Sequence, residues 1–331
     1  MITIVRRSKK RVSVFQWILA TALFTVSCTT DVWNETEDDA NAICFQAPQT
    51  ESRAAVEGSS LPANSSFLVW GGYDNNVTNV FDGETVSEFG GVWNYEGGTR
   101  YWIPGKTYSF YGVYPYGLEN VSCTNEGTLN ISNFDCSTST DLMVASRPNI
   151  VAEDGISQGV QLSFRHLLAR VVLVAQCNEG ASGITDFSPV IYSVVLHGMY
   201  KTGDYKFENS DSWVIPSSGT GESPTSKDDP FFEWRGKKKV TDGGAKVMDV
   251  LVFPQLIGMD YYMDVIYSIT DNVNAEKKSV SIPLSSLSVY EWAAGKQYRY
   301  SLIITPDDRI IFNKPTVNKW DEAVGGIIII D

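Results

Sequence analysis

The sequence has few of the side chains that most enzymes use for proton transfer and metal binding. It contains only two histidines in 331 residues, His166 and His197, and histidine is the side chain most suited to general-base catalysis near neutral pH. Metalloprotease, phosphate-binding-loop and dinucleotide-binding motifs are missing as well. We therefore interpret both histidines as structural and expect no enzymatic activity, no metal and no cofactor.

Basic residues are also scarce. The chain has 26 Lys and Arg against 39 Asp and Glu, which gives a net charge of −13. Five of the basic residues lie within residues 6–11, so the net charge of the chain without residues 1–27 is about −18. Binding to nucleic acid or to anionic membrane surfaces depends on clustered Lys and Arg. The composition therefore excludes nucleic acid as an expected partner.

No apolar run is long enough to span a bilayer comfortably. Residues 12–26 are apolar, follow a basic stretch and end at Ser27-Cys28. A small residue before Cys at this place is typical of a lipoprotein signal peptidase site. We predict a signal peptide at residues 1–27, a lipid on Cys28 and a flexible acidic tether at residues 28–41. Because Thr25 stands where such sites usually carry Leu, plain secretion or an uncleaved anchor remains an alternative.

Cysteine is rare, with five in the chain. If Cys28 carries the lipid, Cys44, Cys123, Cys136 and Cys177 remain, and their spacings match no zinc or redox motif. An even number of cysteines in an exported protein permits disulfides. Cys123 and Cys136, 13 residues apart in a turn-rich region, are the pair that we expect to be joined. The alternative is that they are buried free thiols.

Aromatic and turn-forming residues are abundant, with 9 Trp, 16 Tyr, 15 Phe and 27 Gly. Short runs alternate apolar and polar residues and end in Gly, Pro or Asn, which is the pattern of β-strands. The runs recur at the spacing of a sandwich, and the chain is about twice as long as a typical domain. We predict an all-β protein with two domains, at residues 42–178 and 179–331.

Both ends of the predicted folded region carry distinctive apolar segments. Within residues 42–47, Ile43 and Phe45 alternate with polar or small neighbours, as in one short strand. Arg53, in the polar stretch that follows, is the only basic residue between positions 28 and 100. Residues 327–330 are four consecutive isoleucines, and a strand that is apolar on both faces needs a partner to cover it.

Longer stretches follow one another in a recognisable order. They include FLVWGGY at residues 67–73, YWIPGKTYSFYGVYP at 101–115, VQLSFRHLLARVVL at 160–173 and EWAAGKQYRYSLII at 291–304. This series resembles the fimbrillin family of Bacteroidales surface lipoproteins, in its Mfa-like branch, over nearly the whole mature chain. The resemblance implies two tandem transthyretin-like Greek-key β-sandwich domains and export to the outer membrane as a lipoprotein.

The resemblance also implies assembly by strand exchange, in which a protease removes the N-terminal strand and the C-terminal segment of a neighbouring subunit replaces it. On this chain the displaced strand would contain Ile43 and Phe45, and the cut would follow Arg53. The donor strand would be formed by Ile327, Ile328, Ile329 and Ile330. The residues alone leave three alternatives open: a permanent first strand, an ordinary solvated Arg53, and an isoleucine run that closes its own domain.

We therefore expect a structural or adhesive fimbria (pilus) subunit at the outer membrane. Its partners would be other fimbrial subunits, the membrane through the N-terminal lipid, and a host or glycan ligand. One alternative is a tip or anchor subunit. Another is a monomeric lipoprotein that binds carbohydrate through aromatic residues near turns, namely Tyr73, Trp93, Tyr95, Tyr114 and Tyr116. An all-β hydrolase with an acidic cleft, and a calcium site around residues 74–76 with Asp82 and Glu84, are further alternatives.

Overall fold

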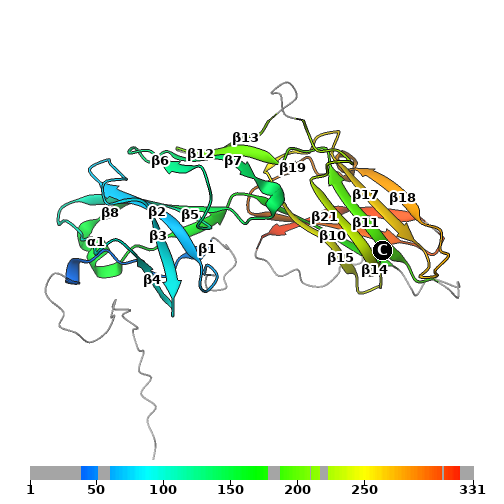
Figure 1. The fold of residues 1–331 in the computed structure, drawn as a ribbon, viewed down its shortest axis with the longest axis horizontal. Helices are drawn as coiled ribbons and strands as arrows, with labels where there is room; N and C mark the ends of the chain where they lie inside the picture. Colours follow the sequence, from blue (N-terminus) through cyan, green and yellow to red (C-terminus); the bar gives the residue numbers. More distant parts are fainter. Residues whose placement is uncertain are drawn as a thin grey trace, which may run out of the picture. The chain divides into compact units, whose positions relative to one another are not determined.

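The computed structural model describes residues 39–50, 60–177, 187–208, 210–216, 223–307 and 309–320. Most of these residues lie in β-strands (Figure 1). Within these ranges the α-helical part is α1 (Ala152–Gln158), and there are three 3-10 turns, η1 (Asp39–Asn41), η2 (Cys136–Thr138) and η4 (Leu284–Leu287). None of the described helices is long and apolar enough to cross a membrane. The predicted all-β fold class is confirmed.

A seven-stranded sheet carries the N-terminal part of the fold. Its strands, in spatial order, are β1 (Gln49–Thr50), β9 (Ser163–His166), β8 (Met143–Val151), β5 (Thr107–Tyr114), β2 (Ser66–Tyr73), β3 (Phe81–Phe89) and β4 (Val92–Tyr95). Neighbours are antiparallel except β1 and β9, which are parallel. Gly90 and Gly91 join β3 to β4 with positive φ at both positions. This two-residue turn matches strand twist and strongly favours glycine.

Aromatic side chains fill the core beneath this sheet. In β5 the residues alternate between buried and partly exposed positions, as the sequence pattern predicted. The fully buried rings of this core belong to Phe67, Phe81, Tyr108, Phe110 and Phe164. Phe67 meets Phe164 edge to face with ring centroids 5.2 Å apart, Phe81 is tilted against Phe110 at 6.1 Å, and Tyr108 stacks on Phe110 at 6.2 Å. These separations lie in the favourable range for aromatic pairs.

Two four-stranded sheets form the C-terminal part. One has the order β15 (Ala245–Val252), β10 (Ala169–Cys177), β20 (Lys296–Ile304) and β21 (Ile310–Lys319). The other has the order β14 (Phe232–Lys239), β11 (Val190–His197), β17 (Tyr262–Ser268) and β18 (Lys278–Pro283). Buried side chains from both sheets, such as Leu173, Leu302, Val194 and Val265, belong to one core. The two sheets therefore pack as a sandwich.

The hydrogen bonds of strand β10 join it to strands from the second half of the chain. The predicted boundary at residue 178 would leave β10 with the N-terminal domain. Its hydrogen bonds instead pair it antiparallel to β15 and parallel to β20, both from the second half of the chain. Most of its residues are buried, on both faces of the strand, which explains the continuous apolar run. The sequence reveals that burial but not the identity of the neighbouring strands.

An ion pair reinforces the pairing of β10 with β15. Arg170 donates from Nε and Nη2 to the two carboxylate oxygens of Asp249, at 2.7 Å each, and Lys246 Nζ lies 2.7 Å from Asp249 Oδ2. Burial raises the pKa of the Asp249 carboxyl, but the bonds from Arg170 and Lys246 outweigh it and hold that pKa below its ordinary value. The carboxylate therefore stays charged at neutral pH.

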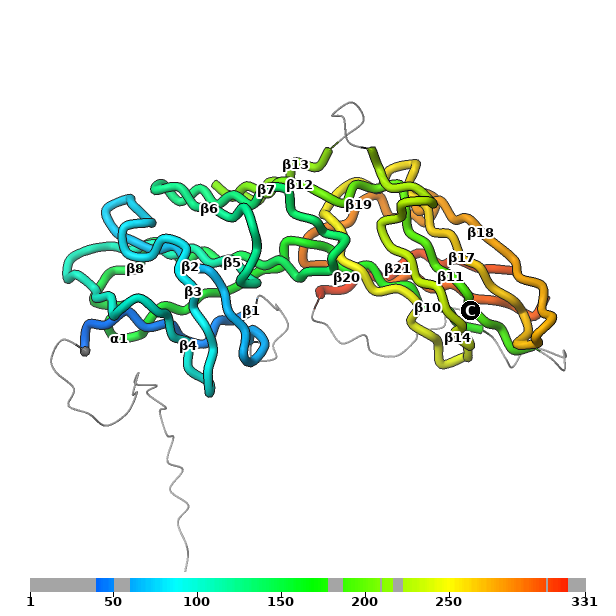
Figure 2. Tube along the Cα trace, in the orientation of Figure 1, coloured from blue at the N-terminus to red at the C-terminus, as the bar shows by residue number. Residues whose placement is uncertain are grey.

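A third sheet joins strands from both halves of the chain. Its order is β13 (Asp211–Val214), β12 (Thr202–Phe207), β7 (Leu129–Asp135) and β6 (Val121–Cys123). The pairing of β7 with β12 is antiparallel, and the two strands lie side by side in Figure 2. A small two-stranded sheet consists of β16 (Gln255–Leu256) and β19 (Glu291–Trp292).

The predicted disulfide between Cys123 and Cys136 is not present, because both side chains are free thiols. Cys123 pairs with Leu129 at the start of β7, whereas Cys136 follows the end of β7. Seven residues of strand separate these two points by roughly 20 Å, and a disulfide requires Cα atoms within about 7 Å. The Cys136 thiol instead donates to Leu251 O at 3.5 Å.

Candidate functional site

The N-terminal segment, residues 41–50, lies against the seven-stranded sheet as an added strand (Figure 2, blue). One edge of the segment runs antiparallel to residues 100–102. Ile43 N donates to Arg100 O at 2.8 Å, and Trp102 N donates to Asn41 O at 2.8 Å. An antiparallel bridge between Ala42 and Tyr101 lies between these two bonds. We call this segment and the residues that contact it the segment site.

The other edge of the segment runs parallel to residues 160–164. Val160 N donates to Cys44 O at 2.8 Å, and Gln46 N donates to Val160 O at 2.9 Å. Gln49 N donates to Leu162 O at 2.9 Å, where β1 begins. Because both edges form backbone hydrogen bonds, the segment has the bonding of an interior strand and not of a loop.

Two side chains of the segment enter the aromatic core. Ile43 is 1 % exposed and Phe45 is 6 % exposed, whereas Gln46 and Ala47 are exposed. The Phe45 ring is surrounded edge to face by four aromatic rings, with centroid distances of 5.5–6.1 Å, those of Phe67, Phe81, Tyr95 and Phe110. The alternation expected for residues 42–47 is therefore real, and it directs residues 43 and 45 inward.

Tyr95 and Arg100 hold the backbone of the segment. The Tyr95 hydroxyl donates to Ile43 O at 3.0 Å and accepts from Arg100 N at 3.1 Å. Burial raises the pKa of the Tyr95 phenol, so the hydroxyl keeps its proton at neutral pH. Sequence reasoning noted Tyr95 only as an aromatic near a turn. Its hydrogen-bond partner lies 52 residues away, and no sequence signal marks such a contact.

Several residues singled out from the sequence lie outside the described ranges. Cys28, Arg53 and the isoleucines at 327–330 belong to this group, so lipid attachment, cleavage and strand donation remain predictions. The described part of the chain ends at Trp320. Its indole stacks on the His166 ring, with centroids 4.4 Å apart and planes inclined by 7°.

Both histidines have carboxylate partners. His166 Nδ1 lies 2.8 Å from Asp141 Oδ1, and His197 Nε2 lies 3.0 Å from Asp264 Oδ2. Each ring is almost fully buried and stacks on an aromatic side chain. These contacts fit the structural role that we predicted for the two histidines.

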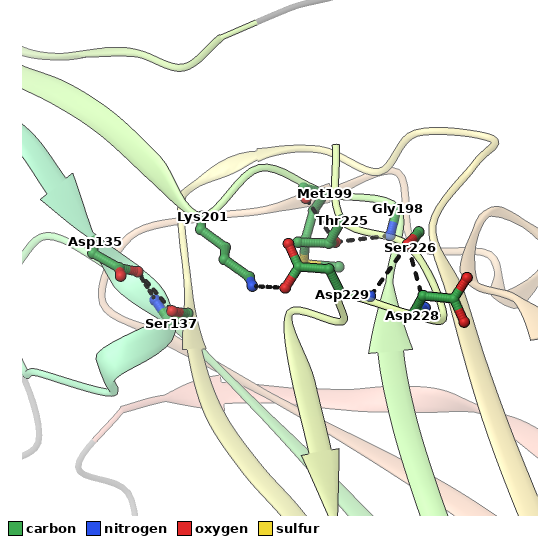
Figure 3. A network of polar contacts seen from close by, with 9 residues as sticks. All are labelled: Asp135, Ser137, Gly198, Met199, Lys201, Thr225, Ser226, Asp228 and Asp229. Atoms are coloured by element: carbon green, nitrogen blue, oxygen red, sulfur yellow. Dashed lines mark hydrogen bonds and ion pairs between the residues drawn. The ribbon is translucent and has the colours of Figure 1, made fainter. Parts of the chain in front are cut away.

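The acidic pair at residues 228–229 supports a loop instead of an acidic cleft (Figure 3). Asp229 Oδ1 pairs with Lys201 Nζ at 2.6 Å, and the backbone amides of Asp228 and Asp229 both point at Ser226 Oγ at 3.3 Å. The pair therefore orders a turn through ordinary side-chain and backbone bonds.

The sequence also contains the spacing Gly-x-Ser-x-Gly at residues 155–159, which sequence reasoning overlooked. In hydrolases this spacing places a serine on a sharp turn between a strand and a helix. Here Ser157 lies within α1, and its hydroxyl donates to Asp154 O at 2.9 Å. The serine is therefore part of a helix and lacks the strained turn that exposes a nucleophile.

Of the residues considered for calcium, those at 74–76 line a polar cavity of about 340 Å³, whereas Asp82 and Glu84 do not. Its polar side chains belong to Asp74, Asn75, Asn76, Thr107, Ser109 and Asn149. Asp74 pairs with Lys106 at 2.6 Å, and Glu84 pairs with Arg100 at 2.5 Å. Across the described ranges, no group of three His, Cys, Asp or Glu side chains is arranged to hold a metal ion. The carboxylates of Asp74 and Glu84 are thus engaged with basic side chains.

A family model described as fimbrillin-like matches residues 52–320, most of the chain. The chain belongs to the fimbrillin-like family. Among solved structures, this fimbrillin-like chain is similar to a fimbrial protein from Bacteroides vulgatus, with 15 % identity and a TM-score of 0.53 over 85 % of this chain and 99 % of the other. A candidate cell adhesion protein from Bacteroides uniformis gives 13 % identity and a TM-score of 0.53, over 84 % and 99 %.

A second candidate cell adhesion protein, from Bacteroides ovatus, gives 16 % identity and a TM-score of 0.52 over 88 % of this chain and 98 % of the other. At these identities the similarity establishes the shared fold. A comparison with curated proteins found no match. The fimbrillin-like model begins at residue 52, just after the N-terminal segment.

Proposed function

We propose that this chain is a structural or adhesive subunit of a surface fimbria. Membership of the fimbrillin-like family supports this assignment, and so does the similarity to the solved structures of a fimbrial protein and of candidate cell adhesion proteins. We further infer that the subunit reaches the outer membrane as a lipoprotein with its lipid on Cys28. The domains would be two transthyretin-like sandwiches in tandem, and other fimbrial subunits would be its partners.

We infer that assembly replaces the N-terminal segment by a strand from a neighbouring subunit. The observation that carries this inference is how the segment is bound. It is a single extended stretch with backbone bonds on both edges and two inward side chains, Ile43 and Phe45. Any strand that offers the same backbone groups and two apolar residues can occupy such a site. The isoleucine run at 327–330 has apolar residues at every position.

Cleavage after Arg53 would release the segment. Arg53 is the only basic residue between positions 28 and 100, and the next one, Arg100, is poorly available to a protease. Its side chain is only 20 % exposed, and its guanidinium is bound by Glu84 and three backbone carbonyls. An Arg-specific protease must draw the arginine side chain into its own pocket. The geometry of Arg100 therefore favours a single cut in the N-terminal region.

Limited digestion of the chain that starts at Cys28 tests this proposal. An Arg-specific protease is added in a limiting amount, the cut site is read by mass spectrometry, and particle size is followed by gel filtration. We expect one early cut after Arg53 and growth into SDS-resistant ladders, and a chain lacking residues 326–331 should be cut but not polymerise. A chain that is cut and remains monomeric would contradict strand donation and favour a tip subunit or a tethered glycan-binding lipoprotein.

A further inference from the structure

Two residues bind the N-terminal segment in a way that does not depend on its side chains. Arg100 O accepts the N–H of Ile43 at 2.8 Å, and the Tyr95 hydroxyl donates to the C=O of Ile43 at 3.0 Å. Both polar groups of one residue's backbone are thus bound. We propose that Tyr95 and Arg100 form a clamp that sets the direction of whichever strand occupies the segment site. This inference rests on the proposed function, since it concerns the strand that replaces the segment.

Contacts outside the segment hold the two residues of the clamp in place. The Tyr95 hydroxyl accepts a hydrogen bond from Arg100 N at 3.1 Å, which orients its own proton toward Ile43 O. The Arg100 guanidinium lies over the Phe81 ring, 4.7 Å from its centroid. It also donates to four neighbours, namely Val80, Glu84, Glu96 and Gly98. A donor and an acceptor held in this way bind a strand with little loss of side-chain entropy.

The clamp offers an acceptor and a donor in a fixed order along the strand. A strand that ran in the opposite direction would bring its C=O toward Arg100 O and its N–H toward the Tyr95 hydroxyl. Two acceptors would then face each other, and one hydrogen bond would be lost. Handedness adds a second constraint. In a reversed strand, the residues whose polar groups face the clamp would turn their side chains away from the core.

Direction needs such a device because the isoleucine run cannot supply it. In the N-terminal segment Ile43, Phe45 and Pro48 are buried, whereas Gln46, Ala47 and Gln49 are exposed. Because the buried positions are unevenly spaced, burial alone favours one orientation of this segment. Residues 327–330 are all isoleucine, and either direction would bury the same side chains. The backbone clamp is therefore the element of the segment site that distinguishes the two directions.

The uncut chain provides the first test, which requires neither cleavage nor assembly. Tyr95→Phe removes the hydroxyl, and Tyr298→Phe is the matched control, because the buried Tyr298 hydroxyl also accepts a backbone N–H, that of Ala293 at 2.8 Å. We expect hydrogen exchange at the Ile43 amide to be roughly fivefold to tenfold faster in Tyr95→Phe and unchanged in Tyr298→Phe. Equal rates at Ile43 in both variants would overturn the clamp.

The second test reads direction in the assembled, Arg53-cut chain. A photoreactive residue at position 330 should cross-link near Gln158, the residue whose carbonyl accepts from the side chain of Gln46. In Tyr95→Phe we expect a second cross-link near Tyr101, from strands that entered in reverse. A single cross-link site in both proteins would overturn the proposal. Failure of the unaltered chain to assemble would count against strand exchange between subunits. The hydrogen-exchange measurement on the uncut chain would then still show whether Tyr95 and Arg100 act as a clamp.

Discussion

Phe45→Ala is the most informative single substitution, because the Phe45 ring provides the largest buried contact of the N-terminal segment. The ring is 6 % exposed and meets four aromatic rings edge to face. Truncating a buried Phe to Ala costs about 3–5 kcal/mol through lost transfer energy and the cavity left behind. If the segment is a separately docked strand, this cost reduces the free energy that holds the segment, while the remainder of the fold is hardly affected.

Hydrogen exchange on the uncut chain measures this free energy directly. A loss of about 3 kcal/mol corresponds to roughly hundredfold faster opening, so the amides of Ile43, Gln46 and Gln49 should exchange faster by about that factor in Phe45→Ala. Phe45→Leu should give a change of about tenfold, because most of the volume is retained. Phe89→Ala is the exposed control, since Phe89 is 82 % exposed.

The reasoning would be refuted by either of two results. If Phe45→Ala accelerates the segment amides no more than Phe89→Ala, the ring does not hold the segment. If the amides of Val171–Val174 in β10 accelerate by the same factor as those of the segment, the whole fold opens together. In that case the segment is a permanent strand, as the sequence alone allowed.

Three further predictions concern other parts of the chain. In native protein, an Arg-specific protease should leave the bond after Arg100 intact, as mass spectrometry of the fragments will show, because the guanidinium is held by four neighbours. Since the pKa of Asp249 is lowered in the fold, its ion pair with Arg170 contributes fully to the stability of the fold above about pH 4. This contribution is lost as the pH falls further and the carboxylate is protonated. In Arg170→Met, the free energy of unfolding should therefore decrease less steeply as the pH falls below about 4. Thiol titration of denatured, unreduced protein should count Cys123 and Cys136 as free.

Alternating patterns in the sequence were sufficient to predict the all-β class and the inward face of the N-terminal segment. Both depend on neighbours within a few residues, as in the Ile43 and Phe45 pair. The same reasoning fails where a contact depends on how strands pair with one another. The Cys123–Cys136 prediction considered only separation along the chain, whereas the register of β6 on β7 places the two thiols at opposite ends of a strand.

Neither the neighbouring strands of β10 nor the role of Tyr95 could be predicted from the sequence. An apolar run such as residues 171–174 shows that a strand is buried on both faces, but many strands can cover it. Tyr95 and Arg100 are brought to Ile43 by the turn after β4, and neither residue type nor spacing signals that contact. Backbone recognition by a side-chain hydroxyl has no sequence motif of its own.

The composition of the assembled fibre tests the central claim most directly. Polymer formed after cleavage at Arg53 is isolated under native conditions, washed, denatured, and analysed by mass spectrometry for the peptide of residues 28–53. Replacement of the N-terminal segment by a neighbour's strand predicts that this peptide is absent from the polymer and recovered in the soluble fraction. One retained copy of the peptide per subunit would contradict strand exchange and show that the segment is a permanent part of the fold.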